Sequence, residues 1–584
     1  MEVGRSALGR AWRLRSCDER LALALSQRLG LEEVVARVMA GRGIGLDQAA
    51  DFLEPRLRSA LPDPSHLLDL DRAAARIADA VEDGQKVGIV GDYDVDGATS
   101  TALFVRYLRS LGVQSLVEIP DRIADGYGPN RQALARLAAA GCGLVVTLDT
   151  GTTAFAPLDE AAEDGLEVVV IDHHAAEDRL PRALAVVNPN RLDQQSPLQH
   201  LAAVGVTFVV TVAVSRELRG RGFFRHRPEP DPLQWLDLVA LGTVCDVVPL
   251  AGLNRAFVRQ GLKVLRQGSN PGLAALAQAA GIAAVTEAWQ LGFALGPRLN
   301  AGGRIGRSDL AARLLATDDP GEASGLAQRL DELNARRQAM EREQLALAEA
   351  AVADAAAAGA PVLVAGHERL HPGIVGILAS RLVERFHRPC FVVALDGQGM
   401  GKGSARSVPG FDLGAAVILA RTAGLLTQGG GHPMAAGLSM SAARLGELAA
   451  FMAERVEAAT LAAPGAPGPL ELDGALAVGG VTSALALQVE RLSPFGAGNV
   501  EPSFALADAR VVETRPVGDS HLACTLTGAA GGRLRAVAFR SRGTPLADAL
   551  LRGEPLRVAG RVKVDRWQGR EGASFHIEDA AAAE

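Results

Sequence analysis

Short runs of β-forming residues alternate with helix-forming stretches between about Val87 and Val248. The runs are VGIV, SLVEIP, LVVTL and EVVVI, followed further along the chain by LVALGTV. This alternation predicts a parallel sheet with helices on both faces, because parallel strands need a crossover connection between them. In open sheets of this kind, ligands bind outside the carboxyl ends of the strands. Functional side chains are therefore expected directly after these runs.

The remaining sequence predicts further domains, since 584 residues are too many for a single hydrophobic core. Residues 326–358 contain neither Gly nor Pro and predict a long helix, which could serve as a spacer, take a direct part in function, or do both. A second α/β pattern begins at PVLVAG (361–366) and ends near residue 460. After a linker at 461–470, five β-like runs predict a small barrel: ARVVE, HLACTLTG, RLRAVAF, PLRVAGRVKV and SFHIED.

The charge balance excludes nucleic-acid binding by bulk charge alone, because 67 acidic residues outnumber 60 basic ones and the formal net charge is -7. Positive charge is nevertheless concentrated within the predicted barrel. Residues 531–570 hold ten basic and three acidic residues together with Phe539 and Trp567. Phosphate contacts and base stacking would both be available there, which suits a single-stranded nucleic acid. The alternative is an ordinary solvated charged face.

Five cysteines lie far apart without a C-x-x-C pair, so the sequence suggests neither a zinc knuckle nor a disulfide framework. The apolar run from Leu201 to Val214 is shorter than the roughly 20 residues that span a bilayer, and predicts a buried helix or strand. The N-terminal segment shows no signal peptide. We therefore expect a cytoplasmic protein without membrane contact.

Carboxylates follow the predicted strands. Asp92, Asp94 and Asp96 alternate after VGIV, Asp149 ends LVVTL, and the triplet 172–174 (DHH) ends EVVVI, while Asp246 follows LVALGTVC. Any one of these aspartates could be a simple helix N-cap. Grouped at one edge of a sheet they would repel one another unless cations neutralise them. Oxygen-rich ligation with few imidazoles favours two Mn²⁺ or Mg²⁺ ions over Zn²⁺ and indicates phosphoester hydrolysis.

The sequences GDYDVDG, LDTG, DHH and GTVCDVVPL, in this order, resemble the DHH phosphoesterase superfamily. Longer matches resemble the RecJ family of bacterial single-strand-specific exonucleases, and these are IPDRIADGYGPN, LGPRLNAGGRIG, HPGIVGILASRL, GKGSARSVPGFDL, GGGHPMAAG and PFGAGNVEP. The resemblance implies a DHH parallel-sheet metal domain, a long connecting helix, a smaller α/β DHH-associated (DHHA1) domain and a C-terminal OB-like β-barrel. The implied segments are 1–65 (N-terminal helical segment), 66–306 (DHH), 307–359 (long helix), 360–462 (DHHA1) and 463–584 (OB-like).

The same resemblance implies the roles of individual residues at the metal centre. The implied metal ligands are Asp94, Asp96, Asp149, Asp172, His173 and Asp246, with Asp149 as the bridge between two ions. His174 would face the scissile phosphate. Pyrophosphatase relatives carry a histidine four residues before the first of the paired aspartates, where this chain has Val90, so the pyrophosphatase branch is disfavoured.

Donors for the phosphates of a DNA strand are implied within the matched motifs, where arginine suits bidentate phosphate binding. Each arginine could instead form a surface ion pair. The implied nucleic-acid contacts are Arg122, Arg298, Asn300, Arg304, Gln338, His371, Arg406, Ser407 and His432. Of these, Gln338 lies on the long helix, and Arg406 with Ser407 could form a pocket for a 5' phosphate.

The resemblance implies a monomeric 5'-to-3' exonuclease that releases nucleoside 5'-monophosphates in recombination, DNA repair and mismatch repair. A single-strand-binding protein and a RecQ-type helicase are the implied partners. Two alternatives stay open. One is a DHH phosphodiesterase for short oligonucleotides or cyclic dinucleotides, and the other is a nucleic-acid-binding scaffold that has lost catalysis. The first is disfavoured by the length of the chain, and the second by the presence of every metal carboxylate.

Overall fold

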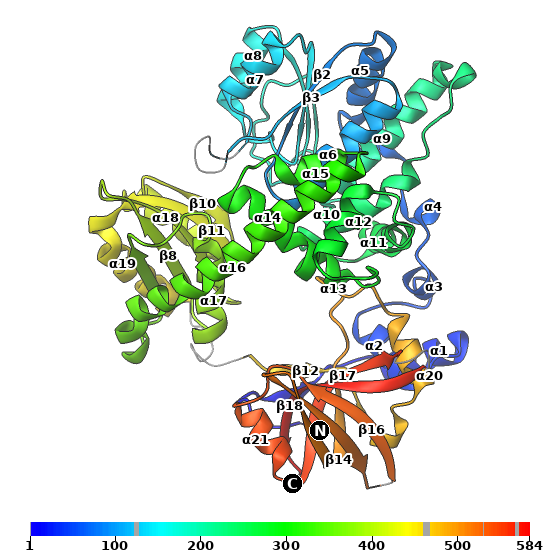
Figure 1. Ribbon diagram of the computed structural model, residues 1–584, viewed down its shortest axis with the longest axis vertical. Coiled ribbons are helices and arrows are strands. Elements are labelled where there is room, and N and C mark those ends of the chain that lie inside the picture. The colour runs from blue at the N-terminus through cyan, green and yellow to red at the C-terminus, as the bar shows by residue number, and fades with distance from the viewer. Residues whose placement is uncertain are drawn as a thin grey trace. The chain divides into compact units, whose positions relative to one another are not determined.

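The computed structural model describes residues 2–121, 126, 128–459, 468–529, 531–566 and 571–583. The chain divides into two compact units (Figure 1). The barrel unit comprises Met1–Ala60, Pro249–Arg259 and Pro467–Glu584, and the two-sheet unit comprises Leu61–Val248 and Gln260–Ala466. Each unit is therefore assembled from segments that are distant in sequence.

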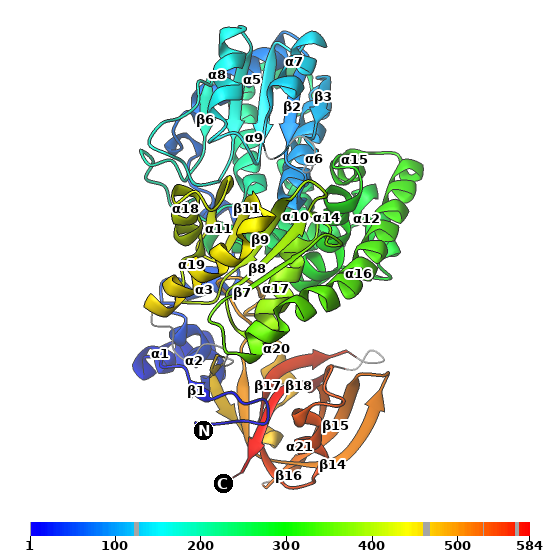
Figure 2. The same ribbon diagram turned by 90° about the vertical axis from the view of Figure 1, so that its left-hand side faces the viewer.

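The first sheet of the two-sheet unit is wholly parallel, as predicted. Its strand order is β3 (Ser115–Glu118), β2 (Val87–Gly91), β4 (Leu144–Leu148), β5 (Glu167–Ile171) and β6 (Ala185–Val187). Helices α7 (Arg131–Ala139) and α8 (Phe155–Glu163) pack on one face, opposite α5 (Leu70–Glu82) and α9 (Ala203–Gly220) (Figures 1 and 2). Every residue of β2 and β4 is buried, which explains their uninterrupted apolar sequences. The short strand β6 was not predicted.

The run LVALGTV is helical, and its prediction as a strand was wrong. It belongs to α10 (Leu236–Cys245), in which every residue from Leu236 to Thr243 is buried. A helix that is apolar all round has no 3.6-residue periodicity to distinguish it from a buried strand. The run from Leu201 to Val214, predicted as a buried helix or strand, lies in α9 for all but its first two residues. Within the described ranges, no helix has the length and apolarity to cross a membrane.

A helical region leads into the long helix α16 (Pro320–Ala357). The region contains α11 (Gly252–Leu265), α12 (Pro271–Ala279), α13 (Ala288–Gln290), the π-helix η4 (Leu291–Leu295), α14 (Gly296–Ile305) and α15 (Leu310–Ala316). Helix α16 has 38 residues and starts earlier than predicted, because Asp319 caps it and Pro320 is tolerated in its first turn. Its first half packs on α12, α14 and α15, and its second half on the second sheet and α17 (Val375–Phe386).

The second sheet lies within the predicted second α/β region. Its order is β10 (Gln428–His432), β11 (Ala435–Ser441), β9 (Met400–Arg406), β8 (Cys390–Leu395) and β7 (Leu363–His367). Among these neighbours β7 and β8 are parallel, and the other pairs are antiparallel. One buried cluster includes residues of α18 (Leu413–Thr422) and α19 (Leu445–Ala458), and another includes residues of α16 and α17. Helices therefore cover both faces of this sheet.

All five β-like runs of the C-terminal portion form strands of a closed barrel. The strands β14 (Phe504–Val517), β15 (His521–Gly528), β16 (Gly531–Ala538), β18 (Gly572–Ala582) and β17 (Pro555–Asp565) follow one another, and β14 pairs with β17 to close the ring. The core of this barrel also includes apolar residues of α1 (Glu19–Leu29) and α2 (Glu33–Gly41). The N-terminal helices thus pack with the barrel, an association that the sequence did not suggest.

A fully buried carboxylate ties the N-terminal segment to the barrel. Asp579 of β18 accepts hydrogen bonds from Ser6 Oγ at 2.5 Å and from Trp12 Nε1 at 3.1 Å. The backbone N–H of Leu8 adds a third at 3.3 Å. A buried carboxylate is tolerated only when such donors satisfy it, so residues 2–14 belong to the fold of the barrel unit.

The motif PFGAGNVEP forms a structural joint inside the barrel unit. Asn499 is buried and donates from Nδ2 to Leu492 O at 2.9 Å and Pro494 O at 2.7 Å. Arg255, also buried, donates to Leu492 O at 2.9 Å and Phe52 O at 2.7 Å. These bonds satisfy backbone carbonyls in a non-repetitive loop, so this motif supports the fold.

Candidate metal centre

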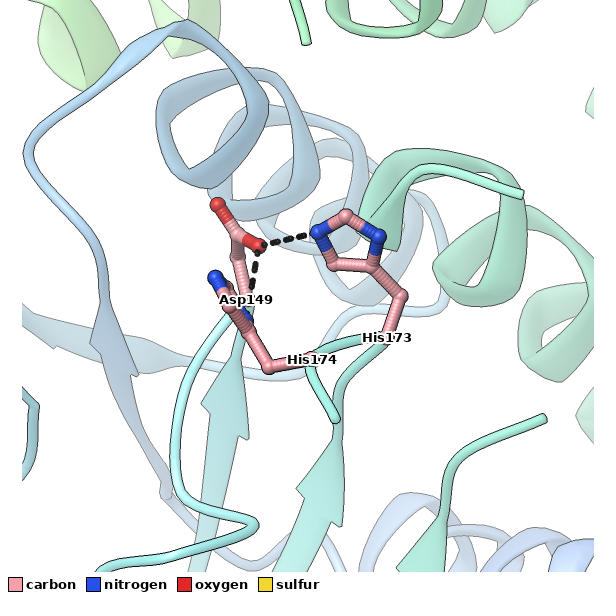
Figure 3. A group of neighbouring side chains, drawn as sticks. All are labelled: Asp149, His173 and His174. Carbon is pink, nitrogen blue, oxygen red and sulfur yellow. Dashed lines mark ion pairs between the residues drawn. The ribbon is translucent and has the colours of Figure 1, made fainter. Parts of the chain in front are cut away.

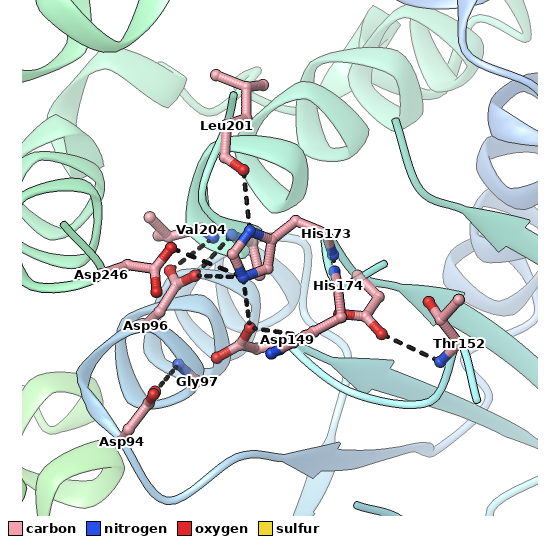
Figure 4. Close-up of polar contacts among 12 residues, drawn as sticks. Asp94, Asp96, Gly97, Asp149, Thr152, His173, His174, Leu201, Val204 and Asp246 are labelled. Atoms are coloured by element: carbon pink, nitrogen blue, oxygen red, sulfur yellow. Dashed lines mark hydrogen bonds and ion pairs between the residues drawn. The ribbon is translucent and has the colours of Figure 1, made fainter. Parts of the chain in front are cut away.

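Seven aspartate and histidine side chains converge at the carboxyl edge of the parallel sheet, and six of them are labelled in Figure 4. Asp94 and Asp96 start α6 (Val95–Ser110), Asp149 follows β4, and His173 and His174 follow β5. Asp246 caps the C-terminus of α10 rather than ending a strand. Three overlapping groups have ligand atoms within 4.8 Å of one another: Asp92–Asp94–Asp149, Asp96–His173–Asp246 and Asp149–His173–His174.

His173 presents one ring nitrogen to three carboxylates. Its Nδ1 is bonded to Leu201 O at 3.1 Å, so that nitrogen carries the proton of the neutral ring and Nε2 has the lone pair. Nε2 lies 3.3 Å from Asp149 Oδ1 and 3.7 Å from oxygens of Asp96 and Asp246. Burial, with the nearby charge of His174, lowers the pKa of His173 to about 4. The neutral ring is the form that binds a metal.

The electrostatics of the cluster fit a bound cation. Burial, reinforced by neighbouring aspartates, raises the pKa of Asp96 to about 7 and that of Asp246 to about 9. Oδ2 of Asp246 is buried and accepts no hydrogen bond among the described residues. Carboxylates crowded in this way must be protonated or must bind metal. The donor set of oxygens and one imidazole nitrogen suits Mn²⁺ or Mg²⁺.

Asp92 belongs to this centre, although the resemblance did not assign it a role. It is buried and groups with Asp94 and Asp149. The signal in the sequence was the alternation of three aspartates after β2. Asp149 occurs in this group and in one of the two histidine groups, and its implied role as the bridge between two ions stays a prediction.

Asp172 has partners other than the clustered carboxylates. Its Oδ1 lies 2.7 Å from His174 Nδ1, and its Oδ2 accepts a hydrogen bond from Thr152 N at 3.0 Å. Among the described residues it belongs to none of the three groups. Figure 3 shows His174 beside Asp149, at 3.8 Å from Nδ1 to Oδ1. The implied role of Asp172 as a metal ligand stays a prediction.

The contact between Asp172 and His174 favours a charged pair. Burial opposes the charge on each side chain, but their hydrogen bond and mutual attraction outweigh that effect. The pKa of His174 rises to about 9, and that of Asp172 falls below its ordinary value. The contact with Asp172 favours the imidazolium form of His174, which can donate a proton or a hydrogen bond to a phosphate oxygen.

Two asparagines donate hydrogen bonds to the backbone carbonyls of the histidine pair. Asn188, directly after β6, donates to His174 O at 2.8 Å and to Thr152 Oγ1 at 2.9 Å. Asn190 donates to His173 O at 2.5 Å. The bonds to the carbonyls of His173 and His174 fix the backbone that carries the two imidazoles. Sequence analysis missed these residues, and the NPN sequence after a short unpredicted strand was the only signal of them.

The elements that carry the ligands approach one another closely. Both carboxylate oxygens of Asp96 accept backbone N–H bonds at the N-terminus of α9, from Ala203 at 2.6 Å and Val204 at 2.9 Å. The positive end of that helix stabilises the carboxylate. Helix α10 packs on α6 at Gly242, where a Cβ atom would lie 2.3 Å from Thr99 Oγ1. Only glycine allows this approach, which places Asp246 beside Asp96.

The implied nucleic-acid contacts on α14 are half-buried. Arg298 already pairs with Asp331 at 2.8 Å and donates to Ala294 O. Arg304 donates to Gly373 O at 3.3 Å, which connects α14 with the loop before α17. Asn300 lies between them in sequence and is partly exposed. Arg122 lies outside the described residues.

The other implied contacts lie on α16 and around the second sheet. Gln338 is exposed on α16, and His371 Nδ1 accepts from Gly373 N at 3.0 Å. Arg406 ends β9 and donates to Ser404 Oγ at 2.9 Å. The adjacent Ser407 is buried and donates to Phe411 O at 2.8 Å. His432, exposed, ends the edge strand β10.

The basic part of the barrel carries an exposed aromatic ring. Phe539, directly after β16, is half exposed, and its ring centroid lies 5.2 Å from that of His521 and 5.0 Å from that of His576. The rings of Phe539, His521 and His576 give the barrel a surface on which a base could stack. Trp567 lies outside the described residues.

Comparison with family models assigns three domains to the chain. Residues 86–243 match the DHH family, N-terminal domain; residues 359–458 match the DHHA1 domain; and residues 472–579 match the RecJ OB domain. The first match contains every sequence-predicted metal residue except Asp246.

Relatives align along nearly the whole chain. The single-stranded-DNA-specific exonuclease RecJ of Dickeya dadantii is 39% identical over 94% of this chain and 96% of its own length. The corresponding protein of Escherichia coli is 38% identical over 86% of this chain and 88% of its own. RecJ from Thermus thermophilus in complex with Mn²⁺ superposes with a TM-score of 0.81 at 32% identity, covering 98% of this chain and 80% of that one. Its Mg²⁺ complex gives 0.76 at 30% identity, covering 98% and 78%.

Proposed function

The chain belongs to the RecJ family of single-stranded-DNA-specific exonucleases, and from that premise we propose that it removes nucleotides from the 5' end of a DNA strand and releases nucleoside 5'-monophosphates. It is a metal-dependent enzyme with a DHH domain. The observation that supports hydrolysis at this centre is the position of Asp149, which belongs both to an all-carboxylate group and to the group that contains His173 and His174.

The residues present fit two divalent ions. Asp92, Asp94 and Asp149 would hold one ion, and Asp96, His173 and Asp246 would hold the other together with Asp149. Bound Mn²⁺ or Mg²⁺ supplies charge that stabilises the phosphoryl transition state and lowers the pKa of a coordinated water. The remaining ligand assignment, that of Asp172, is the least supported, because its carboxylate is bonded to His174 and Thr152.

The protein's own groups position the substrate. His174, held by Asp172 through Nδ1, would donate to an oxygen of the scissile phosphate. Arg298, Asn300 and Arg304 on α14 would contact the DNA backbone near the centre, with Arg122, Gln338, His371 and His432 as further contacts. Arg406 and Ser407 would bind the terminal 5' phosphate. The Ser407 hydroxyl donates to Phe411 O and its backbone N–H donates to Met434 O, so Ser407 would have to exchange one of these bonds to donate to the phosphate.

Polarity and substrate length test this proposal. A single DNA strand with a 5' phosphate, labelled at either end, is incubated with the protein and Mn²⁺, beside blunt duplex and a dinucleotide. We expect the 5' label to appear at once as mononucleotide while the 3'-labelled strand shortens gradually, and EDTA to abolish both. Release of the 3' label first would overturn the polarity. Preference for the dinucleotide would favour the short-oligonucleotide phosphodiesterase.

Asp149→Ala tests the metal assignment in the same assay. We expect activity to fall at least about 1000-fold, because removing the bridge affects both ions. Asp164→Ala, an exposed aspartate of the same domain, is the matched control and should leave the rate within twofold. Comparable rates for the two variants would contradict the assignment.

The biological setting follows from the same proposal. We propose a cytoplasmic monomer with the five segments 1–65, 66–306, 307–359, 360–462 and 463–584, acting in recombination, DNA repair and mismatch repair. A single-strand-binding protein and a RecQ-type helicase would be its partners. The matched OB, DHH and DHHA1 domains support a nuclease of this kind.

A further inference from the structure

Two large aromatic side chains stand exposed on one helical face of the two-sheet unit. Phe293 is 81% exposed, the most exposed large apolar side chain among the described residues, and Trp289 is 51% exposed. They are four residues apart in one uninterrupted helical run, residues 288–305, formed by α13, η4 and α14. Side chains four residues apart lie on the same face of a helix. We call these two rings the aromatic platform.

The opposite face of the same run is buried. Leu291, Leu295 and Leu299 are fully buried. The helix therefore does not need Phe293 or Trp289 for its own packing, and neither ring makes an aromatic or cation–π contact within the described ranges. Single exposed apolar residues are common, but two adjacent aromatic rings on one face are characteristic of a binding surface.

The run that carries the platform also lies against both sides of the metal centre. Near its start, Leu291 O accepts a bond from Cys245 Sγ at 3.5 Å, and a Cβ atom on Gly296 would lie 2.7 Å from that sulfur. Cys245 directly precedes Asp246. Further along, a Cβ atom on Gly303 would lie 2.7 Å from Tyr93 O, between Asp92 and Asp94. The platform thus begins the helix that touches the residues next to ligands of both ions.

The π-helix η4 within this run strengthens the argument. A π-helical turn disrupts the regular hydrogen-bond pattern and is frequently found at functional sites. Here the π-helical turn contains Phe293 and lies between Trp289 and the arginines of α14. A single helix consequently offers aromatic faces in its first turns and phosphate donors, Arg298 and Arg304, in its later turns. Single-stranded DNA is recognised by this combination of stacking surfaces and cationic groups.

We propose that Trp289 and Phe293 stack on bases of the DNA strand while the later turns of the same helix contact its phosphates beside the metal centre. The proposal rests on the proposed function and deepens it by assigning the residues that hold the bases. Stacking does not depend on base identity, because every base has a π-face. The platform would therefore position any sequence, as an exonuclease without sequence preference requires.

Binding of a twelve-residue oligothymidylate in EDTA tests the platform without hydrolysis. We expect tryptophan fluorescence of the full chain to be quenched on binding, and Trp289→Phe to lose most of that quenching while retaining affinity. Trp12 and Trp235 are buried and would respond little, and all chains compared in the fluorescence measurement carry Trp567→Phe so that Trp567 does not contribute. Phe293→Ala should weaken binding about 5- to 100-fold, the range expected for one stacked base, and Phe293→Tyr should restore it.

Leu233→Ala is the matched control. Leu233 is 47% exposed and precedes α10, at the end of that helix opposite Asp246. It should bind the oligonucleotide as the natural chain does. The far-UV circular dichroism spectrum and the midpoint of thermal unfolding of Phe293→Ala should match those of the natural chain, which shows that its fold is intact.

The outcomes distinguish failure of the proposed exonuclease function from failure of the aromatic platform alone. If the natural chain neither binds nor degrades the oligonucleotide, the proposed function fails. If the natural chain does both and Phe293→Ala binds equally well, only the platform is overturned, and its aromatic face then serves another contact such as a protein partner. Weaker binding by Leu233→Ala to the same extent would also overturn it, because the effect would then not be specific to the platform.

Discussion

The three adjacent side chains of the DHH triplet have three different surroundings. His173 turns its Nε2 toward three carboxylates, whereas Asp172 turns to His174 and to the backbone of Thr152. From these contacts we expect Asp172 to orient His174 and His173 to bind metal, although the two residues are neighbours in sequence.

Asp172→Asn should lower kcat about 10- to 100-fold, the range typical for residues that orient a functional imidazole. Asparagine can still accept a bond from His174, but it lacks the charge that keeps the imidazole protonated. The Mn²⁺ concentration for half-maximal activity should change little. The measurement is kcat across a Mn²⁺ titration. A large increase in the Mn²⁺ requirement, with kcat restored at saturation, would instead identify Asp172 as a ligand.

At this scale the sequence predicted the residues that lie at strand ends and missed those whose role depends on packing. Asp94 and Asp149 were predictable because the ends of parallel strands meet at one edge of a sheet. Asn188 and Asn190 hold the carbonyls of His174 and His173, 14 and 17 residues away. Such bonds depend on which loops meet in three dimensions, and an asparagine after an unpredicted strand carries no distinctive pattern.

Helix α10 shows the same limit for a whole element. Its sequence, LDLVALGTVC, is nearly all apolar, and the β-branched valines favour a strand as much as a buried helix. Helix packing decides the outcome, because Gly242 allows α10 to lie against α6. Asp246 was correctly grouped with the other carboxylates even though the element before it was assigned wrongly. The barrel strands, which alternate buried and exposed residues, were predicted correctly.

The first turn of α10 contains Asp237, a buried carboxylate that lowers the stability of the fold by an amount that depends on pH. Burial raises the pKa of Asp237 to about 6, above the value near 3.8 of an unperturbed aspartate. The folded state therefore binds this proton more tightly than the unfolded chain does. The free energy of unfolding therefore falls as the pH rises from about 4 to 6, because the folded chain must then bury a charged Asp237. Above about pH 6 the destabilisation by Asp237 is complete.

Asp237→Asn should raise the free energy of unfolding by about 2 to 3 kcal/mol at pH 8, the equivalent of a shift of about two pKa units. The asparagine oxygen can still accept the bond from Leu238 N. Urea unfolding at pH 8 and pH 4.5 measures the effect, and the gain should shrink at the lower pH. Asp548→Asn, an exposed aspartate in the first turn of α21 (Pro545–Leu551), should change little at either pH. An equal gain at both pH values would exclude the protonation of Asp237 as the cause.

Across the whole molecule, the net charge of -7 is the sum of acidic and basic regions that lie in different parts of the sequence. The aspartates of the metal centre account for part of the negative charge, and bound cations reverse their local field. Within the barrel, several basic residues are already paired: Arg561 and Lys563 with Glu501, and Arg566 with Glu490. The positive charge available to DNA is therefore smaller than the sequence count indicates.

Arg533 and Arg535 on β16 are two basic residues of the barrel that have only long contacts to carboxylates. Their side chains are 72% and 74% exposed, and their nearest carboxylate contacts are long, at 3.8 Å to Glu513 and 3.5 Å to Asp565. Exposed ion pairs of this kind contribute little to stability, so these side chains can exchange their partners for phosphates. The sequence predicted a basic barrel, but only the structure distinguishes these two arginines from the paired ones.

Replacing both Arg533 and Arg535 by glutamine should weaken binding of a long single DNA strand and make the dependence of log Kd on log salt concentration shallower by about 1.4, since each lost phosphate contact removes about 0.7 for single strands. The measurement is a salt titration of binding in EDTA. Arg20→Gln with Arg28→Gln, exposed on α1 of the same unit, removes the same charge as a control and should leave the slope unchanged. Hydrolysis of a dinucleotide should be equal in both double variants. If the two salt slopes fall equally, net charge rather than the β16 surface attracts the DNA, and the barrel then contributes no specific phosphate contact through these arginines.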